Sequence, residues 1–270
     1  MIKRLPLVLS FCSLPAFAAP QLTTEIQSGD MWFKAETTQL DSKTKYTDSS
    51  SGANITYNSS ADSTNFFGLF AHDTVNGITP LFGFNVQKIS GDDSNAITVY
   101  GVDLGIINKS SNQKNRAFVL SHLRGDNEDE IRSITQLSAA FQTSDISSKN
   151  YNEFVIAYTK LADTDDIEGG SGFSISNSLK IKSDDTIDFI ANVSVSIIDD
   201  TEFVNTNTTL ESDATIGFEA VVALNLAPEY TMSFSLGKSF GGGSFNNGID
   251  APVDVDDEVT IIGVDLVARF

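Results

Sequence analysis

The sequence predicts an all-β protein, a closed antiparallel transmembrane β-barrel of about twelve strands, within a range of roughly 10 to 14. Three observations carry this prediction. Apolar and polar residues alternate with a period of two along most of the chain, whereas helical periodicity is nearly absent. Nearly all alternating segments reach the roughly 9–11 residues that a tilted strand needs to cross a bilayer. The connections between these segments alternate between long and short.

The first 18 residues have the layout of a secretory signal peptide. The start MIKR is basic, an apolar run follows, and AFA at residues 16–18 is a small-x-small cleavage site. The alternative is a buried N-terminal strand or helix. Residues 19–270 then form the barrel domain. The single cysteine, Cys12, lies in the part expected to be removed, so we expect no disulfide or thiolate chemistry in the remainder.

The expected strands follow one another along the whole remaining chain. One of the clearest is TIDFIANVSVSI, where Ile187, Phe189 and Val193 share an apolar face and the other face is polar. The segment ANITY (53–57) either extends the second strand or lies in a loop. In chain order the expected strands are 29–40, 63–72, 78–90, 96–107, 117–124, 131–144, 151–162, 171–181, 186–198, 214–226, 230–240 and 258–270.

The connections differ in charge as well as in length. Asp and Glu gather in the first, third and every further odd-numbered connection, which contain stretches such as GDDSN, GDNEDE, DTDDIEGG and DVDDE. The even-numbered connections hold about as many basic as acidic residues. A barrel in an outer membrane has short periplasmic turns and longer external loops. A soluble two-sheet sandwich also buries alternate residues and is the alternative fold, but it gives no reason for this sorting.

The overall charge restricts the partners. The chain has 36 acidic and 17 basic residues, a formal net charge of −19, and such a chain repels nucleic acid. After residue 20 no apolar run approaches the 18 residues typical of a membrane-spanning helix.

The signal peptide, the alternating strands and the final segment VTIIGVDLVARF, which ends on Phe270, resemble bacterial outer-membrane β-barrel proteins. The resemblance covers residues 19–270 and identifies this porin-like class without a subfamily. It implies a location in the outer membrane of a Gram-negative cell, in contact with lipid and lipopolysaccharide. It also implies that the last strand, with Phe270 as the assembly signal, is recognised by the barrel-assembly machinery.

The register places charged residues of both signs in the expected lumen. A twelve-stranded barrel is wider than the eight-stranded barrels that side chains fill and narrower than 16–18-stranded porins. The charges therefore either line a narrow channel or form ion pairs that close a structural barrel. The acidic mouth favours cations or neutral solutes. The candidates are Lys34, Glu36, Asp103, Arg132, Glu153, Lys180, Asp188, Glu219, Asp265 and Arg269.

Two other function classes remain as alternatives. An outer-membrane enzyme would use His122 at the rim; Ser121 is not its partner, because adjacent strand residues point to opposite faces. A surface-interaction protein would act through its acidic loops, which can attract divalent cations but lack EF-hand spacing, or through Arg124-Gly125-Asp126. We expect no catalysis, no cofactor and no specific metal site.

Overall fold

A computed structural model of the chain describes residues 23–91, 96–109, 114–126, 133–143, 150–163, 167–183, 185–206, 208–247 and 252–270. The expected signal peptide and Arg132 lie outside these ranges, as do most residues of the acidic stretches GDDSN and GDNEDE.

Within these residues twelve strands form the barrel, and each overlaps one of the twelve strands expected from the sequence. Two short strands, β10 (Thr201–Phe203) and β11 (Thr208–Ser212), and two 3-10 helices, η2 (Thr23–Glu25) and η3 (Val204–Thr206), complete the elements described. The barrel strands are β1 (Met31–Asp48), β2 (Asn54–Ala71), β3 (Ile78–Gly91), β4 (Ile97–Lys109), β5 (Asn115–Gly125), β6 (Ile134–Gln142), β7 (Asn150–Leu161), β8 (Ser171–Lys182), β9 (Ile187–Ile198), β12 (Thr215–Ala227), β13 (Tyr230–Asn246) and β14 (Val253–Arg269).

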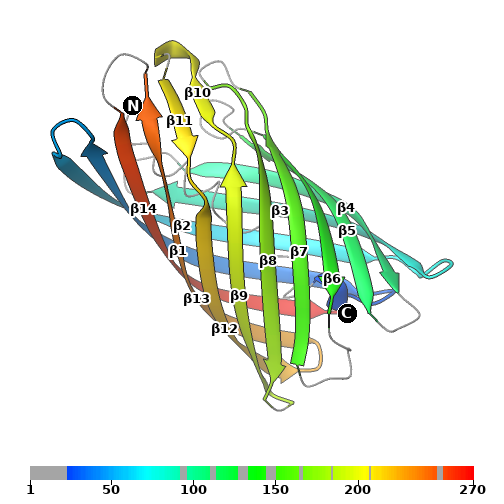
Figure 1. Ribbon diagram of the computed structural model, residues 1–270. Helices are drawn as coiled ribbons and strands as arrows, with labels where there is room; N and C mark the ends of the chain where they lie inside the picture. Colours follow the sequence, from blue (N-terminus) through cyan, green and yellow to red (C-terminus); the bar gives the residue numbers. More distant parts are fainter. Residues whose placement is uncertain are drawn as a thin grey trace.

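The sheet closes on itself. Consecutive barrel strands pair antiparallel, β9 pairs with β12, and β14 pairs with both β13 and β1. The strands tilt around a common axis and form a cylinder (Figure 1). Closure gives the backbone groups of every barrel strand a partner on both sides, which is the condition for a β-structure in hydrocarbon.

The two ends of the barrel differ. Met31 and Phe270 meet at one end, which we call the terminal end, where Met31 N donates to Phe270 O at 2.8 Å and Phe270 N to Met31 O at 2.9 Å. We call the opposite end the loop end. Its connections are 49–53, 92–96, 126–133, 162–170, 199–214 and 247–252.

Four strands extend further toward the loop end than the sequence pattern predicts. We expected loops over 41–62 and 241–257, but β1, β2, β13 and β14 continue through most of them, with β1 and β14 paired up to Asp48 and Val253. The acidic stretch DVDDE, expected in a loop, is therefore strand, and ANITY extends β2. The alternation is lost there because both faces carry polar side chains, for example Ser42 and Lys43.

The connection between β9 and β12 is also more structured than expected. Its strands β10 and β11 form a hairpin, and β11 pairs with the extended part of β13. An isolated bridge joins Phe203 of β10 to Ile167 in the connection between β7 and β8. This hairpin adds to the barrel wall at the loop end.

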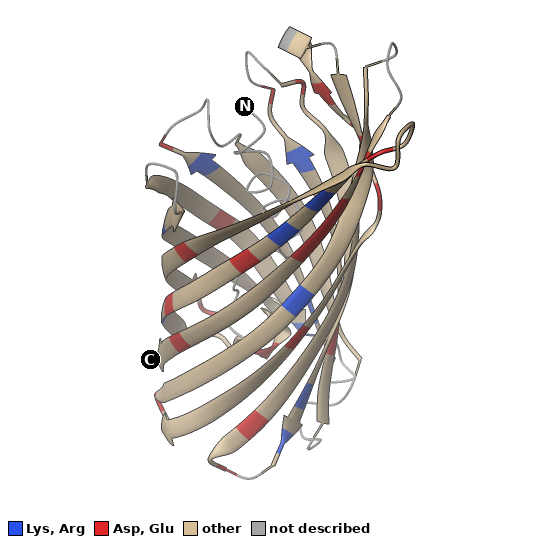
Figure 2. Cartoon of the chain, turned by 90° about the vertical axis from the view of Figure 1, so that its left-hand side faces the viewer, with Lys and Arg blue, Asp and Glu red and all other residues tan. Residues whose placement is uncertain are grey.

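The outward faces of the barrel strands are apolar. On β4, Tyr100, Val102, Leu104 and Ile106 are 40–56% exposed, and the other strands carry similar residues. Charged residues along the strands are separated by long uncharged stretches (Figure 2). Soluble monomers rarely expose such a continuous apolar surface, whereas a barrel in lipid requires it. The alternative of a soluble sandwich is wrong, since these residues face outward from a closed sheet.

Aromatic side chains mark both ends of this apolar surface. Phe270 lies 6.3 Å from both Phe33 and Tyr230, measured between ring centroids, at the terminal end. Toward the loop end, the Tyr158 and Phe173 rings are 5.0 Å apart. Among the described residues no helix is both long and apolar enough to span a membrane.

Candidate functional site in the barrel lumen

The barrel encloses a cavity of about 390 Å³, bordered by residues from all twelve barrel strands, by Thr23 of η2 and by Ile26, which follows η2. This volume lies within the range of small-molecule sites in proteins. The cavity is the candidate functional site because the lumen is only partly filled by side chains.

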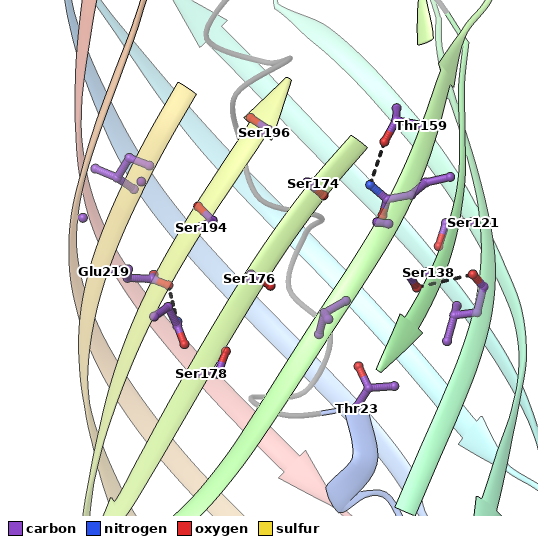
Figure 3. Close-up of a pocket in the computed structure, with 18 of the residues that line it drawn as sticks. Thr23, Ser121, Ser138, Thr159, Ser174, Ser176, Ser178, Ser194, Ser196 and Glu219 are labelled. Atoms are coloured by element: carbon purple, nitrogen blue, oxygen red, sulfur yellow. Dashed lines mark hydrogen bonds between the residues drawn. The ribbon is translucent and has the colours of Figure 1, made fainter. Parts of the chain in front are cut away.

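One wall of the cavity carries small hydroxyl side chains. Ser174 and Ser176 alternate along β8, and their register partners Ser196 and Ser194 alternate along β9, so that all four face the lumen (Figure 3). The period of two puts every second residue on the same face. Because serine is small, this wall leaves space for a solute and offers it both donors and acceptors. Further hydroxyls come from Ser121, Ser138, Thr159, Ser178, Ser235 and Ser239.

The opposite wall is apolar. Phe67 and Leu69 of β2 and Leu81 of β3 are each 5% exposed and border the cavity. In the closed order of twelve strands, β2 and β3 lie six steps from β8 and β9, which is half of the circumference. The lumen therefore has a wall rich in serine and, opposite it, the apolar wall of Phe67, Leu69 and Leu81, beside which the polar Ser63, Asn85 and Gln87 also border the cavity.

Carboxylates outnumber cations in the cavity. Lys34 Nζ lies 3.3 Å from Glu36 Oε1 and 3.6 Å from Asp265 Oδ2. Asp103 of β4 and Glu219 of β12 are six strand steps apart and so face each other across the lumen. Neither of these two forms an ion pair within the part of the chain that the structure describes. Both carboxylates accept hydrogen bonds from neutral side chains instead.

Neutral neighbours hold the two carboxylates in place. Ser121, on the strand next to Asp103, donates its hydroxyl proton to that carboxylate. Asn192 Nδ2 donates to Glu219 Oε2 at 2.7 Å. These bonds orient the carboxylates without neutralising them.

Several acceptor oxygens in the lumen have no hydrogen-bond partner. Asn85 is 7% exposed and borders the cavity, and its Oδ1 is buried without a donor. The same holds for Asn192 Oδ1 and Asp265 Oδ1, which also belong to cavity-lining residues, and for Asn65 Oδ1 on β2. These oxygens have almost no exposed surface and are packed into the barrel wall, Asn85 Oδ1 against Gly101 of β4, so a solute in the cavity does not contact them.

η2 forms the floor of the cavity at the terminal end. Thr24 is fully buried, its N and Oγ1 donate to Glu153 Oε2 at 2.7 and 2.6 Å, and its hydroxyl also hydrogen-bonds the Tyr151 hydroxyl. Asn115 Nδ2 donates to Thr24 O at 2.8 Å. Ile26 packs into an apolar cluster with Phe67 and Leu69, among others. Strands on both sides thus hold η2 inside the barrel.

Three ion pairs fix the chain around this floor. Lys180 Nζ lies 3.1 Å from Glu25 Oε1 and 3.3 Å from Asp188 Oδ2. At the terminal end, Arg269 Nη2 lies 3.0 Å from Asp30 Oδ2, and its guanidinium carbon is 5.1 Å from the centre of the Trp32 ring. These charges hold residues 25–30 against the barrel wall.

The ten lumen residues named from the sequence separate into four groups. Lys34, Glu36, Asp103, Glu153, Glu219 and Asp265 border the cavity. Lys180 and Asp188 hold η2, and Arg269 caps the terminal end, while Arg132 lies outside the described residues. The sequence reasoning missed η2, because residues 19–28 show no periodicity, and it missed the unpartnered asparagines, whose partners depend on the three-dimensional packing.

His122 does not reach the lumen. It lies on the outward, exposed face of β5, and its Nδ1 is 2.9 Å from Thr135 Oγ1 on β6. Ser121, beside it, borders the cavity on the other face. His122 therefore lies toward the loop end, as the sequence predicts, but on the outer surface of the barrel, because Ser121 and every second residue from it face the lumen. Among the described residues no group of three His, Cys, Asp or Glu could hold a metal ion.

The fold is similar to that of known outer-membrane barrels. No protein-family model and no curated protein matches the sequence. An outer membrane channel from Pseudomonas putida F1 superposes with a TM-score of 0.69 at 11% identity, covering 95% of this chain and 100% of that chain. The translocator domain of the autotransporter NalP from Neisseria meningitidis gives 0.50 at 12% identity, with coverage of 99% and 94%. The NanC porin gives 0.50 at 11% identity, with coverage of 83% and 98%.

Proposed function

We propose that this protein is an outer-membrane channel with a narrow lumen for small cationic and uncharged polar solutes. The single observation that carries the proposal is the cavity inside the closed barrel, with its wall of serine hydroxyls and its excess of carboxylates. A barrel with only a structural role gains stability from a packed interior, and an unfilled polar lumen gives it none.

The proposed location rests on the outer surface of the barrel. The apolar outward faces, the aromatic side chains at both ends and the expected signal peptide all support insertion into the outer membrane. The terminal end would face the periplasm. In that orientation the connections of the loop end, with their acidic stretches, would face the outside and gather cations.

Basic side chains on the outer surface of the barrel support contact with lipopolysaccharide. Lys88 on β3, Arg124 on β5 and Lys160 on β7 are exposed on outward faces near the loop end, where the apolar surface ends. We propose that this set, the basic collar, binds lipopolysaccharide phosphates, for which Arg and Lys are suited. A second proposed partner is the barrel-assembly machinery, which would bind the C-terminal strand with Phe270.

The electrostatics of the lumen support a preference for cations. Around the charge pair of Lys34, the carboxylates of Glu36, Asp103, Glu219 and Asp265 give the cavity a negative balance. A low-dielectric wall focuses this field on any ion inside. Passage of anionic solutes would need a row of cations along the lumen. Lys34 does not serve this purpose, because it already pairs with Glu36 and Asp265.

Planar-bilayer recording of the refolded protein tests the proposal. We expect discrete small-conductance steps and a reversal potential that shows K⁺ to be more permeant than Cl⁻. The double variant Asp103→Asn with Glu219→Gln should lower this selectivity, because it removes the two carboxylates that lack an ion pair. Glu258→Gln is the matched control, since Glu258 lies outside the lumen with its Oε1 2.7 Å from Lys238 Nζ.

A lack of conductance contradicts the proposed channel only if η2, the floor of the cavity, does not itself block the current. The recording therefore includes a variant without Thr23–Ile26, which lacks η2. If both proteins insert and neither conducts, the proposal is wrong and the barrel has a structural or interaction role. A preference for Cl⁻ would contradict the proposed cation selectivity.

A further inference from the structure

We infer that the cavity contains a binding site for a protonated organic amine with a short hydrocarbon part. The inference rests on the proposed channel function and names the solute class that the lumen recognises. It depends on two features of the cavity: its carboxylates and its apolar wall.

The charge of the solute follows from the carboxylates. Glu36 and Asp265 share one ammonium group, that of Lys34, and Asp103 and Glu219 interact with neutral groups only. Lys238 also borders the cavity, but its Nζ lies 2.7 Å from Glu258 Oε1 and 5.2 Å from the Phe240 ring centre, on the outward face. The lumen therefore has room for added positive charge.

The hydrogen-bond chemistry points to a solute with N–H donors. The carboxylates of Asp103 and Glu219 border the cavity, and each can accept hydrogen bonds beyond the one that it receives from Ser121 or Asn192. An ammonium group supplies three donors and no acceptor.

A bare metal ion does not fit these groups. Ca²⁺ takes six to eight oxygen ligands at close range, and the described residues contain no cluster of three metal-ligating side chains. The carboxylates of Asp103 and Glu219 instead come from opposite sides of the lumen, from β4 and β12. Such a spread suits a molecule with amine groups separated by carbon atoms.

The apolar wall accounts for the hydrocarbon part. Phe67, Leu69 and Leu81 line the side of the cavity opposite the serines. A short alkyl chain between two ammonium groups can contact these side chains while the charged ends reach the carboxylates, and burial of its methylene groups favours binding. A hydrated inorganic cation gains nothing from this wall.

The test measures 1,4-diaminobutane against two matched probes. Tetramethylammonium carries the charge without N–H donors, and 1,4-butanediol has the carbon chain without the charge. We expect 1,4-diaminobutane to block the K⁺ current of the refolded full chain at a concentration about tenfold or more below either probe, as the loss of charge-assisted hydrogen bonds implies. Isothermal titration calorimetry in detergent micelles, which needs no conduction, should show the same order.

Variants locate the site. Asp103→Asn with Glu219→Gln should weaken 1,4-diaminobutane binding about tenfold, while Glu258→Gln should leave it unchanged. Heat-modifiable migration in gels checks that each variant is folded. If one does not fold, single Glu219→Gln replaces it.

The outcomes separate the inference from the proposed function. Equal binding of 1,4-diaminobutane and tetramethylammonium, or no binding by a protein that conducts K⁺, overturns the amine site and leaves the channel standing. Binding by a protein that never conducts, with or without η2, supports the site and contradicts the channel. If Glu258→Gln weakens the binding of 1,4-diaminobutane as much as the double lumen variant does, the binding site does not lie in the lumen.

Discussion

Tyr46 shows how a single residue depends on the loop-end extension. It lies on β1 beyond the apolar part of the strand, and its ring contacts Tyr57 at 5.6 Å and Phe245 at 6.4 Å between centroids. Its hydroxyl is buried without a partner. Burial, and then the nearby Asp257 carboxylate, raise the pKa of Tyr46 to about 12. In an unfolded chain the pKa of tyrosine is about 10.

This shift predicts loss of the extension in strong alkali. A pKa raised in the folded state favours folding below about pH 10, and the benefit is lost as the pH rises toward about 12. The tyrosinate absorbance of Tyr46 is obtained as the difference between the unmodified protein and Tyr46→Phe. We expect this absorbance to titrate near pH 12 in the folded protein and near pH 10 in denaturant. Titration of this group near pH 10 in the folded protein would contradict the burial of Tyr46.

At the scale of elements, η2 is the part of the site that depends most on contacts distant in sequence. Thr24 and Glu153 are 129 positions apart and share two hydrogen bonds. Thr24→Val keeps the shape of the side chain but removes its hydroxyl, which should destabilise the docking of η2 by about 1–3 kcal/mol.

The measurable consequence is a change in conductance. If η2 leaves the floor more often, Thr24→Val should increase the mean single-channel conductance of the refolded protein or add a larger conductance level. Thr38→Val is the control. Thr38 lies on β1 and borders the cavity, and among the described contacts none joins it to η2. Identical traces for Thr24→Val and the unmodified protein would show that η2 does not limit the current.

The comparison of sequence and structure explains which elements a pattern can predict. All twelve barrel strands follow from alternation, since lipid on one side and a polar lumen on the other impose a period of two. The extensions of β1 and β14 do not, because Asp41 and Lys43 face outward where Ser42 and Thr44 face inward, and neither face is apolar. The inward direction of Asp103 and Glu219 follows from register, but their lack of a cationic partner depends on the whole barrel.

Phe270 lies at the seam where β14 pairs with β1 and closes the barrel. Its backbone pairs with Met31, and its ring contacts Phe33 and Tyr230 on the two strands that flank β14. Deleting Phe270 removes these contacts and the proposed assembly signal together, so we expect less folded barrel in outer-membrane fractions, measured by heat-modifiable migration. Phe270→Tyr, which keeps an aromatic ring, should assemble nearly normally. Unchanged assembly of the deletion variant would contradict the role of this residue.

At the scale of the whole molecule, charge is separated between the lumen and the outer surface. The cavity holds carboxylates, whereas the basic collar faces outward near the loop end. In the proposed channel, ions would therefore lie closest to the carboxylates, whereas the three cations of the basic collar point away from the lumen. The expected ion selectivity would then be exposed to screening by salt.

Selectivity should therefore decrease as the salt concentration rises. The screening length is about 10 Å in 0.1 M salt and about 3 Å in 1 M salt, so that at high salt the lumen carboxylates no longer act across the cavity. We expect the permeability ratio of K⁺ to Cl⁻, obtained from reversal potentials, to be largest in dilute KCl and to approach unity in concentrated KCl. In Asp103→Asn with Glu219→Gln the dependence on salt should be flatter, because fewer fixed charges remain to be screened. A ratio that is independent of salt in the unmodified protein would mean that pore width, and not the fixed lumen charge, determines which ions pass.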